Sequence, residues 1–485
     1  MRTSRFGLTL LFLAGCAVNP VTGRHDFVLV STEKEKEIGK QAAAEIAAEM
    51  GIYEEASLES YVRAVGERLA AHSPRRDIDY EFHVADVEEP NAFTLPGGHI
   101  YVTRGLLVLV NSEDELACVI GHEIGHGAAR HSVQQISRRA PLNIVTGITS
   151  GVVGLASPLL GSLVGGAGQL ASGLVLAPYS RDQEREADRI GQQLAAEGGW
   201  DPAAMATFLR TLQRYEALRG ESGWQFRFFG SHPSTPERVE STAANAADFR
   251  RADIAPLSPS RTAFLQHFDG LPTGVNVANG YFDGRNFIQP DLGVFLTFPE
   301  GWRQRNLHKA TVAAAPDGGA VITLSIAAKS DDPLDGARAM AREVGDALLR
   351  RTESTTVGSL RAAHAVFHAR GDRGEIDVDI TWIAYRGSVF ELVCLTSPGN
   401  LAALQKPLLG VRKSFRPLTA AERAGVREDR LRLVNAGRGE TPEEVVARSA
   451  SAWNAAMFAV ANGVSAGQAL AAGETVKITA AEKYH

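Results

Sequence analysis

The feature that most constrains this chain is a short motif, GHEIGH, at residues 121–126. In a helix of ~3.6 residues per turn, His122 and His126 fall on one face, so both imidazoles can reach a single metal ion. Zinc accepts neutral imidazole, and a catalytic zinc site has three protein ligands and one open position. Glu123 then lies beside the metal-bound water and is the candidate general base for attack on a peptide carbonyl. The motif therefore predicts a metal-dependent hydrolase.

Such a motif also arises by chance in unrelated helices, so the surrounding residues matter. Ser112, with Glu115 three residues later, predicts a capping box at the start of a helix. Apolar residues follow at helical spacing, at Leu116, Val119, Ile120 and Ile124. The motif is therefore expected in a helix long enough to be rigid.

A third ligand is expected on another capped helix, near residues 179–191. Glu184 and Asp188 are four residues apart and share a helix face, whereas Glu186 points about 200° away from Glu184. We predict Glu184 as the third ligand and Asp188 as its neighbour, which accepts an N–H from a ligating histidine. For Glu186, Arg185 and Arg189, we favour a solvated helix face with ion pairs.

These separated motifs resemble a known family. The series HEIGH (122–126), ARH (129–131), EREAD (184–188) and SHP (231–233) is similar to the gluzincin metallopeptidases that include the CAAX prenyl protease, HtpX and the periplasmic protease BepA. The resemblance spans roughly residues 30–245. Unlike the prenyl protease and HtpX, this chain lacks a clear set of membrane spans, as the soluble members do.

The resemblance implies one Zn²⁺ per chain, held by His122, His126 and Glu184, with Glu123 as general base. In BepA-like members the histidine that matches His232 can occupy the fourth zinc position and hold the enzyme inactive. The loop sequence alone leaves three roles for His232 open: a fourth ligand, a donor to the tetrahedral oxyanion, or a structural residue.

The first 15 residues are predicted to be a lipoprotein signal peptide. A positive end and an apolar core precede the sequence LAGC, which resembles a bacterial lipobox and implies acylation of Cys16. Two or more acyl chains give stable attachment to a membrane; the alternative is a short anchor that is never cleaved. Ala17 after the cysteine favours, by family analogy, an outer-membrane lipoprotein that faces the periplasm. Residues 16–30 are predicted to be a tether.

Two stretches of the peptidase region, residues 31–250, have alternative interpretations. Residues 78–110 are predicted to form strands, and residues 91–98 resemble the family's edge strand above the zinc, which would pair with an extended substrate; an ordinary hairpin is the alternative. Residues 140–178 carry no charged side chain, and we favour two buried or membrane-touching helices over a transmembrane hairpin. His99 is interpreted as a surface residue.

The remainder of the chain changes in character. Residues 251–285 are predicted to be a surface linker, 286–418 a compact α+β accessory domain loosely similar to PsbP-like domains, and 431–480 a degenerate LysM-like module. Such a module binds peptidoglycan glycans or acts as a structural cap. The predicted fold class is α+β: a mainly helical zincin-type metallopeptidase domain with a small sheet, then an α+β domain and the LysM-like module.

Composition limits the function. The chain has 485 residues, three cysteines and a net charge of −6, which excludes a disulfide framework and argues against nucleic-acid binding. We predict a zinc metalloendopeptidase of the bacterial cell envelope that acts on misfolded or stalled envelope proteins and is attached to the outer membrane, with peptidoglycan as a possible further partner. The alternatives are a non-proteolytic periplasmic chaperone, a wall-tethered scaffold with a closed zinc site, and hydrolysis of cell-wall peptides.

Overall fold

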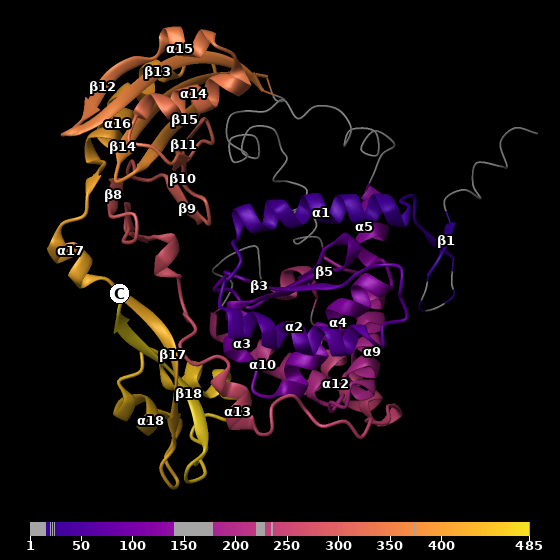
Figure 1. Cartoon of the computed structure of the whole chain (residues 1–485). Helices are drawn as coiled ribbons and strands as arrows, with labels where there is room; N and C mark the ends of the chain where they lie inside the picture. The colour runs from indigo at the N-terminus through magenta and orange to yellow at the C-terminus, as the bar shows by residue number, and fades with distance from the viewer. Residues whose placement is uncertain are drawn as a thin grey trace, which may run out of the picture.

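The computed structural model describes residues 16–19, 21, 23, 25–139, 178–219, 228–233, 236–371 and 374–484. The chain combines α and β structure in three blocks, which follow one another in sequence (Figure 1). A mainly helical block comes first, a block with a large sheet second, and a small unit with two helices and two strands last. The predicted signal peptide, residues 1–15, and residues 140–177 of the two helices predicted over 140–178 lie outside the described residues.

The first block is mainly helical and surrounds one small sheet. Its elements are β1 (Cys16–Val18), β2 (His25–Phe27), α1 (Thr32–Glu49), α2 (Ala56–Ala70), β3 (Glu81–Ala85), β4 (Ala92–Thr94), η1 (Pro96–Gly98), β5 (His99–Thr103), α3 (Arg104–Leu109), α4 (Glu113–Ala128), α5 (His131–Arg139), α9 (Arg181–Glu197), α10 (Ala204–Arg219), α11 (Phe228–Ser231), α12 (Pro236–Asn245) and η2 (Ala246–Asp248). The sheet has the order β3-β5-β4, with β3 parallel and β4 antiparallel to β5.

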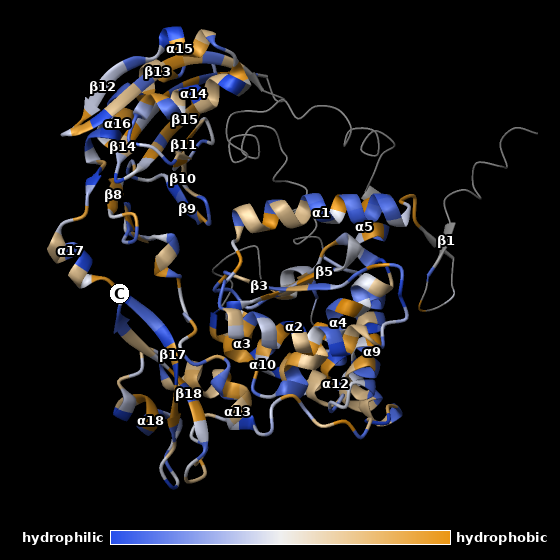
Figure 2. Cartoon of the chain, viewed as in Figure 1, coloured by the Kyte–Doolittle hydropathy of each residue, from blue (hydrophilic) through white to orange (hydrophobic). Residues whose placement is uncertain are grey.

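The two faces of this sheet are covered differently. Phe82, Val84, Ile100 and Val102 point into the main core with α2 and α4, while Phe93 and Tyr101 pack with α1 on the other face. The helices of the block carry both hydrophobic and hydrophilic residues along their length (Figure 2). Successive side chains of a strand point to opposite faces of the sheet. The sheet therefore lies between α1 and α4, the helix that carries the metal motif.

Several local predictions in this block are confirmed, and two need correction. Helix α1 begins after Ser31, whose Oγ accepts the Lys34 N–H at 3.2 Å, as expected of an N-cap. The predicted capping box of α4 is half formed, because Ser112 accepts from Glu115 N but the Glu115 carboxylate accepts from Asn111 N at 2.7 Å. Residues 104–109 form helix α3 and not a strand, since Thr103 caps them.

The second block is built on an antiparallel sheet of order β12-β13-β14-β15-β11-β10-β9. Its elements, with those that connect it to its neighbours, are α13 (Arg261–Gln266), η3 (Val277–Asn279), β6 (Tyr281–Asp283), β7 (Asn286–Gln289), β8 (Val294–Thr297), β9 (Arg303–Leu307), β10 (Ala310–Ala314), β11 (Ala320–Ala328), α14 (Pro333–Val344), α15 (Ala347–Arg351), β12 (Glu353–Val357), β13 (Leu360–Gly371), β14 (Gly374–Tyr385), β15 (Ser388–Thr396), α16 (Leu401–Ser414), β16 (Arg416–Pro417) and α17 (Ala420–Gly425).

Residues 374–396 form a hairpin. Strands β14 and β15 join through Arg386 and Gly387, both at positive φ (49° and 72°), as a two-residue hairpin turn requires. Two separate helices, α14 and α15, precede this sheet's first edge strand, because Gly345 takes a φ of 97° between them.

The segment predicted as a surface linker, residues 251–285, is partly internal. Phe264, Leu265, Phe268 and Leu271 are 0–3% exposed and belong to the main hydrophobic core. The segment also pairs with the C-terminal unit, because Leu271 O accepts from Leu431 N and Gly270 N donates to Leu431 O, each at 2.8 Å. The Pro, Gly and Ser residues of the segment 251–285 form turns. Its apolar residues pack in the core and hold two blocks together.

The last unit comprises β17 (Arg427–Asn435), α18 (Pro442–Ser449), α19 (Ala455–Ala461) and β18 (Thr475–Lys483), with the two strands antiparallel. It therefore begins with a strand before residue 431, the predicted boundary. Lys477 is fully buried and its Nζ donates to Val108 O and Val110 O, each at 2.7 Å, at the end of α3. Buried hydrogen bonds from Lys477 thus attach the last unit to the first block.

The described residues contain no helix with both the length and the apolar composition needed to cross a membrane.

Candidate metal centre

The metal motif lies in α4, which starts in a strongly acidic turn. Glu113, Asp114 and Glu115 occupy that turn, where the positive end of the helix dipole stabilises negative charge. His122 and His126 lie about two and three turns further on, on one face, and are 1% and 0% exposed. The expected helix therefore exists and is almost wholly internal.

Helix α9 crosses α4 at a pair of glycines. A Cβ on Gly191 would lie 2.6 Å from His122 N, and one on Gly121 would lie 2.8 Å from Gly191 O. Any side chain at these positions would push the helices apart. The glycines thus bring Glu184, one to two turns before Gly191 on α9, next to the two histidines on α4.

Four side-chain atoms converge at this crossing. His122 Nε2 lies 3.0 Å from His126 Nε2 and 3.2 Å from His232 Nδ1. Glu184 Oε1 lies 3.3 Å from His126 Nε2 and 3.1 Å from His232 Nδ1. Two ligands ~2.1 Å from one tetrahedral ion are ~3.4 Å apart, so this spacing fits a single zinc ion.

The protonation of the cluster also fits a cation. His122 Nδ1 lies 2.9 Å from Asp188 Oδ1, which favours a proton on Nδ1 and leaves the Nε2 lone pair directed at the centre. The lone pair of His122 Nε2 then faces those of His126, His232 and the Glu184 carboxylate in a buried interior. A cation bound there would coordinate all four groups. Burial, followed by the neighbouring imidazole of His122, holds the pKa of His126 well below its usual value, which favours the neutral form that binds metal.

Arg238 supports the centre from behind. Its guanidinium donates to Asp188 from Nε at 2.8 Å and from Nη2 at 2.6 Å, and Nη1 is 2.5 Å from Glu184 Oε2. Burial alone would raise the pKa of Glu184, but the charges of His232 and Arg238 hold it well below its usual value. The outer carboxylate oxygen is thus occupied by Arg238, while Oε1 faces the histidines.

Glu123 lies beside the cluster and is oriented by the sheet. Thr94 Oγ1, on strand β4, donates at 2.9 Å to Glu123 Oε2 and lies 2.7 Å from Glu123 O. Among the described residues, Glu123 Oε1 accepts no hydrogen bond, and it lies 3.5 Å from His232 Nε2. One carboxylate oxygen is therefore held in place and the other is available for a proton.

Aromatic rings close the site. Tyr179 stacks on His126 with centroids 3.9 Å apart, and Phe228 stacks on His232 at 4.5 Å. Tyr179 N also donates to Ser231 O at 3.0 Å, which joins the two segments. Glu123 and His232 are both 0% exposed. In this conformation the side chains of the cluster are buried, and His232 Nδ1 lies where it could serve as a fourth ligand.

The structure brings His122, His126, Glu184 and His232 together, with Asp188 beside His122 and Glu123 beside His232. Arg185 pairs with Asp182 and Glu237, and Arg189 with Asp248, as expected of a solvated face. Glu186 is only 25% exposed, 3.6 Å from His131 Nε2.

Three supporting residues were missed by sequence reasoning: Arg238, Thr94 and Tyr179. Arg238 could have been found from the sequence, because it follows His232 by only six residues. It lies in the first turn of α12, close to the segment that carries His232.

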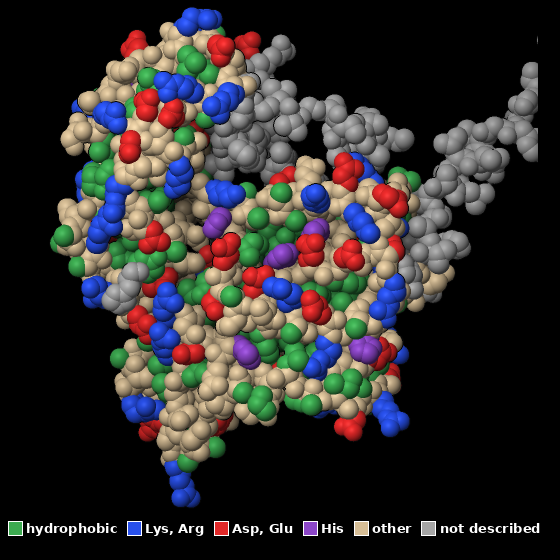
Figure 3. Space-filling view, in the orientation of Figure 1, with side chains coloured by type: hydrophobic (Ala, Val, Ile, Leu, Met, Phe, Trp, Pro, Cys, Tyr) green, Lys and Arg blue, Asp and Glu red, His purple; other side chains and the backbone are tan. Residues whose placement is uncertain are grey.

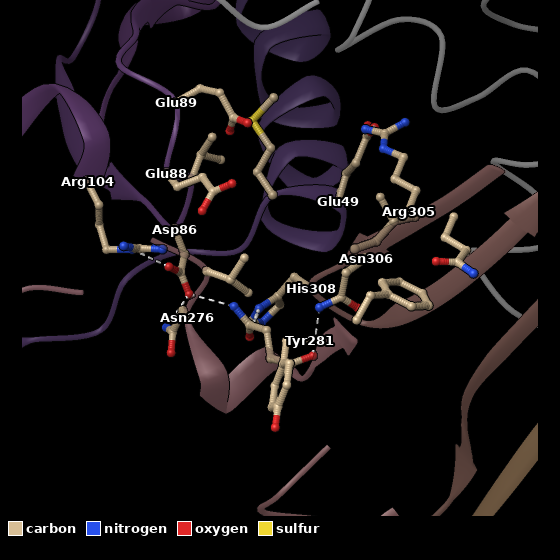
Figure 4. Close-up of a pocket in the computed structure, with 17 residues that line it drawn as sticks. Glu49, Asp86, Glu88, Glu89, Arg104, Asn276, Tyr281, Arg305, Asn306 and His308 are labelled. Carbon is tan, nitrogen blue, oxygen red and sulfur yellow. Dashed lines mark hydrogen bonds and ion pairs between the residues drawn. The ribbon is translucent and has the colours of Figure 1, made fainter. Parts of the chain in front are cut away.

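A separate pocket of about 300 Å³ lies between the first two blocks (Figure 4). Asp86 pairs there with Arg104 and accepts from Asn276 and Asn279 at 2.6 and 2.7 Å. Burial raises the pKa of Glu88 and Glu89, which also line it. None of the metal-centre residues lines this pocket, whose polar network holds residues 274–279 against the first block.

Comparisons with known proteins agree with this site. Residues 56–246 match the model of Peptidase family M48. The chain is 34% identical over 225 residues to "Mitochondrial metalloendopeptidase OMA1" of Schizosaccharomyces pombe. The aligned region covers 45% of this chain and 63% of that protein. It is 30% identical over 271 residues to "Beta-barrel assembly-enhancing protease" of Escherichia coli O157:H7, with 54% and 52% covered. The chain thus spans less than two thirds of the length of these relatives.

A solved structure of cyanobacterial PsbP from Synechocystis sp. PCC 6803 matches 30% of this chain and 95% of its own, at 12% identity and a TM-score of 0.23. At that score the likeness supports no statement about the second block.

Proposed function

We propose that this chain, whose residues 56–246 belong to peptidase family M48, is a zinc-dependent endopeptidase. The observation that carries the proposal is the convergence of His122, His126, Glu184 and His232 around one point, with Glu123 beside them. Three imidazoles and one carboxylate are the donor set that zinc prefers. The names of the relatives, a metalloendopeptidase and a protease, support the same reaction class.

A zinc ion bound there would supply a Lewis acid that polarises a carbonyl and lowers the pKa of a water molecule. Glu123 would take a proton at Oε1 and return it to the departing amine, since Thr94 already occupies Oε2. Asp188 would keep the proton of His122 on Nδ1. Arg238 would hold the Glu184 carboxylate in the orientation observed.

The conformation described is a closed form of the enzyme. His232 Nδ1 lies 3.1 Å from Glu184 Oε1, where it would be a fourth ligand, and His232 Nε2 lies 3.5 Å from Glu123, which is 0% exposed. Strand β4 pairs only with β5 within the described residues, yet its three residues are buried, so a substrate strand has no access. We infer that residues 228–232 must move before a peptide can bind along β4.

Misfolded or stalled envelope proteins are the proposed substrates. An unfolded chain can adopt the extended form that pairs with an edge strand, and the printed name of the second relative refers to β-barrel assembly. Attachment to the outer membrane through Cys16 is part of this proposal. Replacing Cys16 by Ser should release the protein from the membrane fraction; a variant that stays membrane-bound would refute the anchor.

A non-proteolytic chaperone or scaffold is the second candidate. It is favoured by the complete burial of Glu123 and by the occupation of the fourth position by His232. The peptidoglycan contact of the C-terminal unit belongs to either proposal, and pull-down with purified peptidoglycan tests it.

Cleavage of unfolded casein separates the two candidates. The wild type should cleave slowly, Glu123→Gln should not cleave although it keeps its zinc, and His232→Ala should cleave faster than the wild type. Glu197→Gln, at the exposed end of the same helix, is the matched control and should behave as the wild type. If no variant cleaves casein while zinc is bound, the scaffold is the correct function.

A further inference from the structure

A second group of metal-ligand side chains lies on the small sheet. Glu81 and His83 are on β3, and His99 is the first residue of β5. One ligand atom from each lies within 4.8 Å of the other two. From the sequence His99 is expected at the surface, but its side chain is only 14% exposed and its Nδ1 lies 2.9 Å from Glu81 Oε2.

The strand register fixes this arrangement. Residues two apart on a strand share a face, so Glu81 and His83 project together. His99 is the direct partner of Glu81 across the parallel pair β3 and β5, so it projects to the same side. The intervening Phe82 and Val84 point into the main core, which places the group on the face opposite α4.

The spacing suits a small cation. His99 Nδ1 and His83 Nε2 lie 2.9 and 3.6 Å from the same carboxylate oxygen, Glu81 Oε2. These distances bracket the ~3.4 Å expected between two ligands of a tetrahedral zinc ion. His83 is also held by its ring, which packs on Tyr101 with centroids 5.1 Å apart. Two rigid imidazoles and one carboxylate thus face one point.

The group is open on one side. The side chain of Glu81 is 56% exposed and that of His83 29%, so water can fill the remaining positions. Figure 3 shows histidine side chains beside acidic ones on this face, below α1 and over β3 and β5. By contrast, His72 and Glu197 form a surface pair 3.7 Å apart that belongs to no group of three ligand side chains among the described residues.

We propose that Glu81, His83 and His99 form a second, solvent-accessible Zn²⁺ site, distinct from the buried centre. An ion there joins β3 to β5 on the outer face of the sheet. Because β5 pairs with β4, which carries Thr94, the ion stiffens the sheet that orients Glu123. With only three protein ligands and exposure to water, this site binds Zn²⁺ more weakly than the buried centre.

Counting bound Zn²⁺ tests the proposal without any measurement of catalysis. The full chain, purified without a histidine tag, is dialysed against buffered free Zn²⁺, and its zinc is measured by atomic spectrometry. The wild type should bind two ions, the second released by a weaker chelator than the first. The double variant His83→Ala, His99→Ala should bind one, and the control His72→Ala should still bind two.

Glu81→Gln provides a milder test in case the double variant fails to fold. Its second ion should bind at least about tenfold more weakly, because loss of even an outer partner costs 10- to 100-fold. The proposal is overturned if the wild type saturates at one ion or if the double variant retains two. Either result leaves the buried centre and the proposed peptidase activity untouched.

Discussion

The guanidinium of Arg238 lies 2.5 Å from the outer oxygen of Glu184, on the side of the carboxylate turned away from the histidines. Both side chains are almost fully buried, at 4% and 0% exposed. Removing one partner of such a pair leaves an uncompensated buried charge. The metal centre therefore depends on a residue that is not itself a ligand.

Arg238→Gln should weaken zinc binding about 10- to 100-fold, the range measured when outer partners of metal ligands are lost. Glu184 would lose the group that holds Oε2, and Asp188 would lose two hydrogen bonds. Zinc affinity is measured by competition with a chromogenic chelator. Arg189→Gln, on the exposed face of α9, is the control and should leave the affinity unchanged. Equal affinities in both variants would show that Arg238 does not position Glu184.

Gly191→Ala should lower both stability and zinc affinity. Its new methyl group would lie 2.6 Å from His122 N, so α9 must shift away from α4 and carry Glu184 with it. Gly410→Ala in α16 is the matched control: nothing lies within 4 Å of its Cβ, and a compatible Gly→Ala change stabilises by up to about 1 kcal/mol. Chemical denaturation and zinc titration of both variants provide the measurement. A Gly191→Ala variant as stable as the wild type would argue against close packing at this crossing.

Glu113→Gln should reduce the free energy of unfolding by about 3 kcal/mol at neutral pH, because hydrogen bonds to a charged group contribute about 1.5–3 kcal/mol. The carboxylate accepts from Trp200 Nε1 and Tyr61 Oη, each at 2.7 Å, and from the backbone N–H groups of residues 257 and 258. Urea denaturation measures the loss. The exposed Glu240→Gln on α12 should change stability by less than about 0.5 kcal/mol.

The loss in Glu113→Gln should also depend on pH. Burial alone would raise the pKa of Glu113, but the bonds from Trp200 and Tyr61 bring it below the ordinary value of 4.5. A carboxyl with a lowered pKa stabilises the fold fully above its unfolded pKa and loses that contribution as pH falls through the folded pKa. The difference between wild type and variant should therefore shrink in acid. A difference that stays constant down to acid unfolding would contradict this account.

Removal of zinc should lower the melting temperature. Without a cation, the facing lone pairs of His122, His126 and Glu184 repel each other in a dry interior, and a ligand that binds only the folded state stabilises it. Calorimetry before and after chelation measures the shift, and added Zn²⁺ should restore it. In Glu123→Gln the shift should be as large as in the wild type, because Glu123 is not a ligand. An unchanged melting temperature after verified zinc loss would exclude a stabilising metal.

The sequence by itself determined the local parts of this protein. The spacing of His122 and His126, the cap at Ser112 and the four-residue step from Glu184 to Asp188 depend on helix geometry, which acts within a turn or two. The hairpin at Arg386 and Gly387 follows in the same way from turn chemistry. These elements were predictable because short-range backbone rules decide them.

Only the tertiary structure decided what lies next to what. Arg238 against Glu184, Thr94 against Glu123 and His83 beside His99 each join segments that no periodicity relates. The segment at 251–285 looked like a linker because its turn residues are visible in the sequence, whereas the burial of Phe264 and Phe268 depends on partners in other blocks. Helix crossings and strand register are set by packing over the whole chain, and a local pattern does not contain that information.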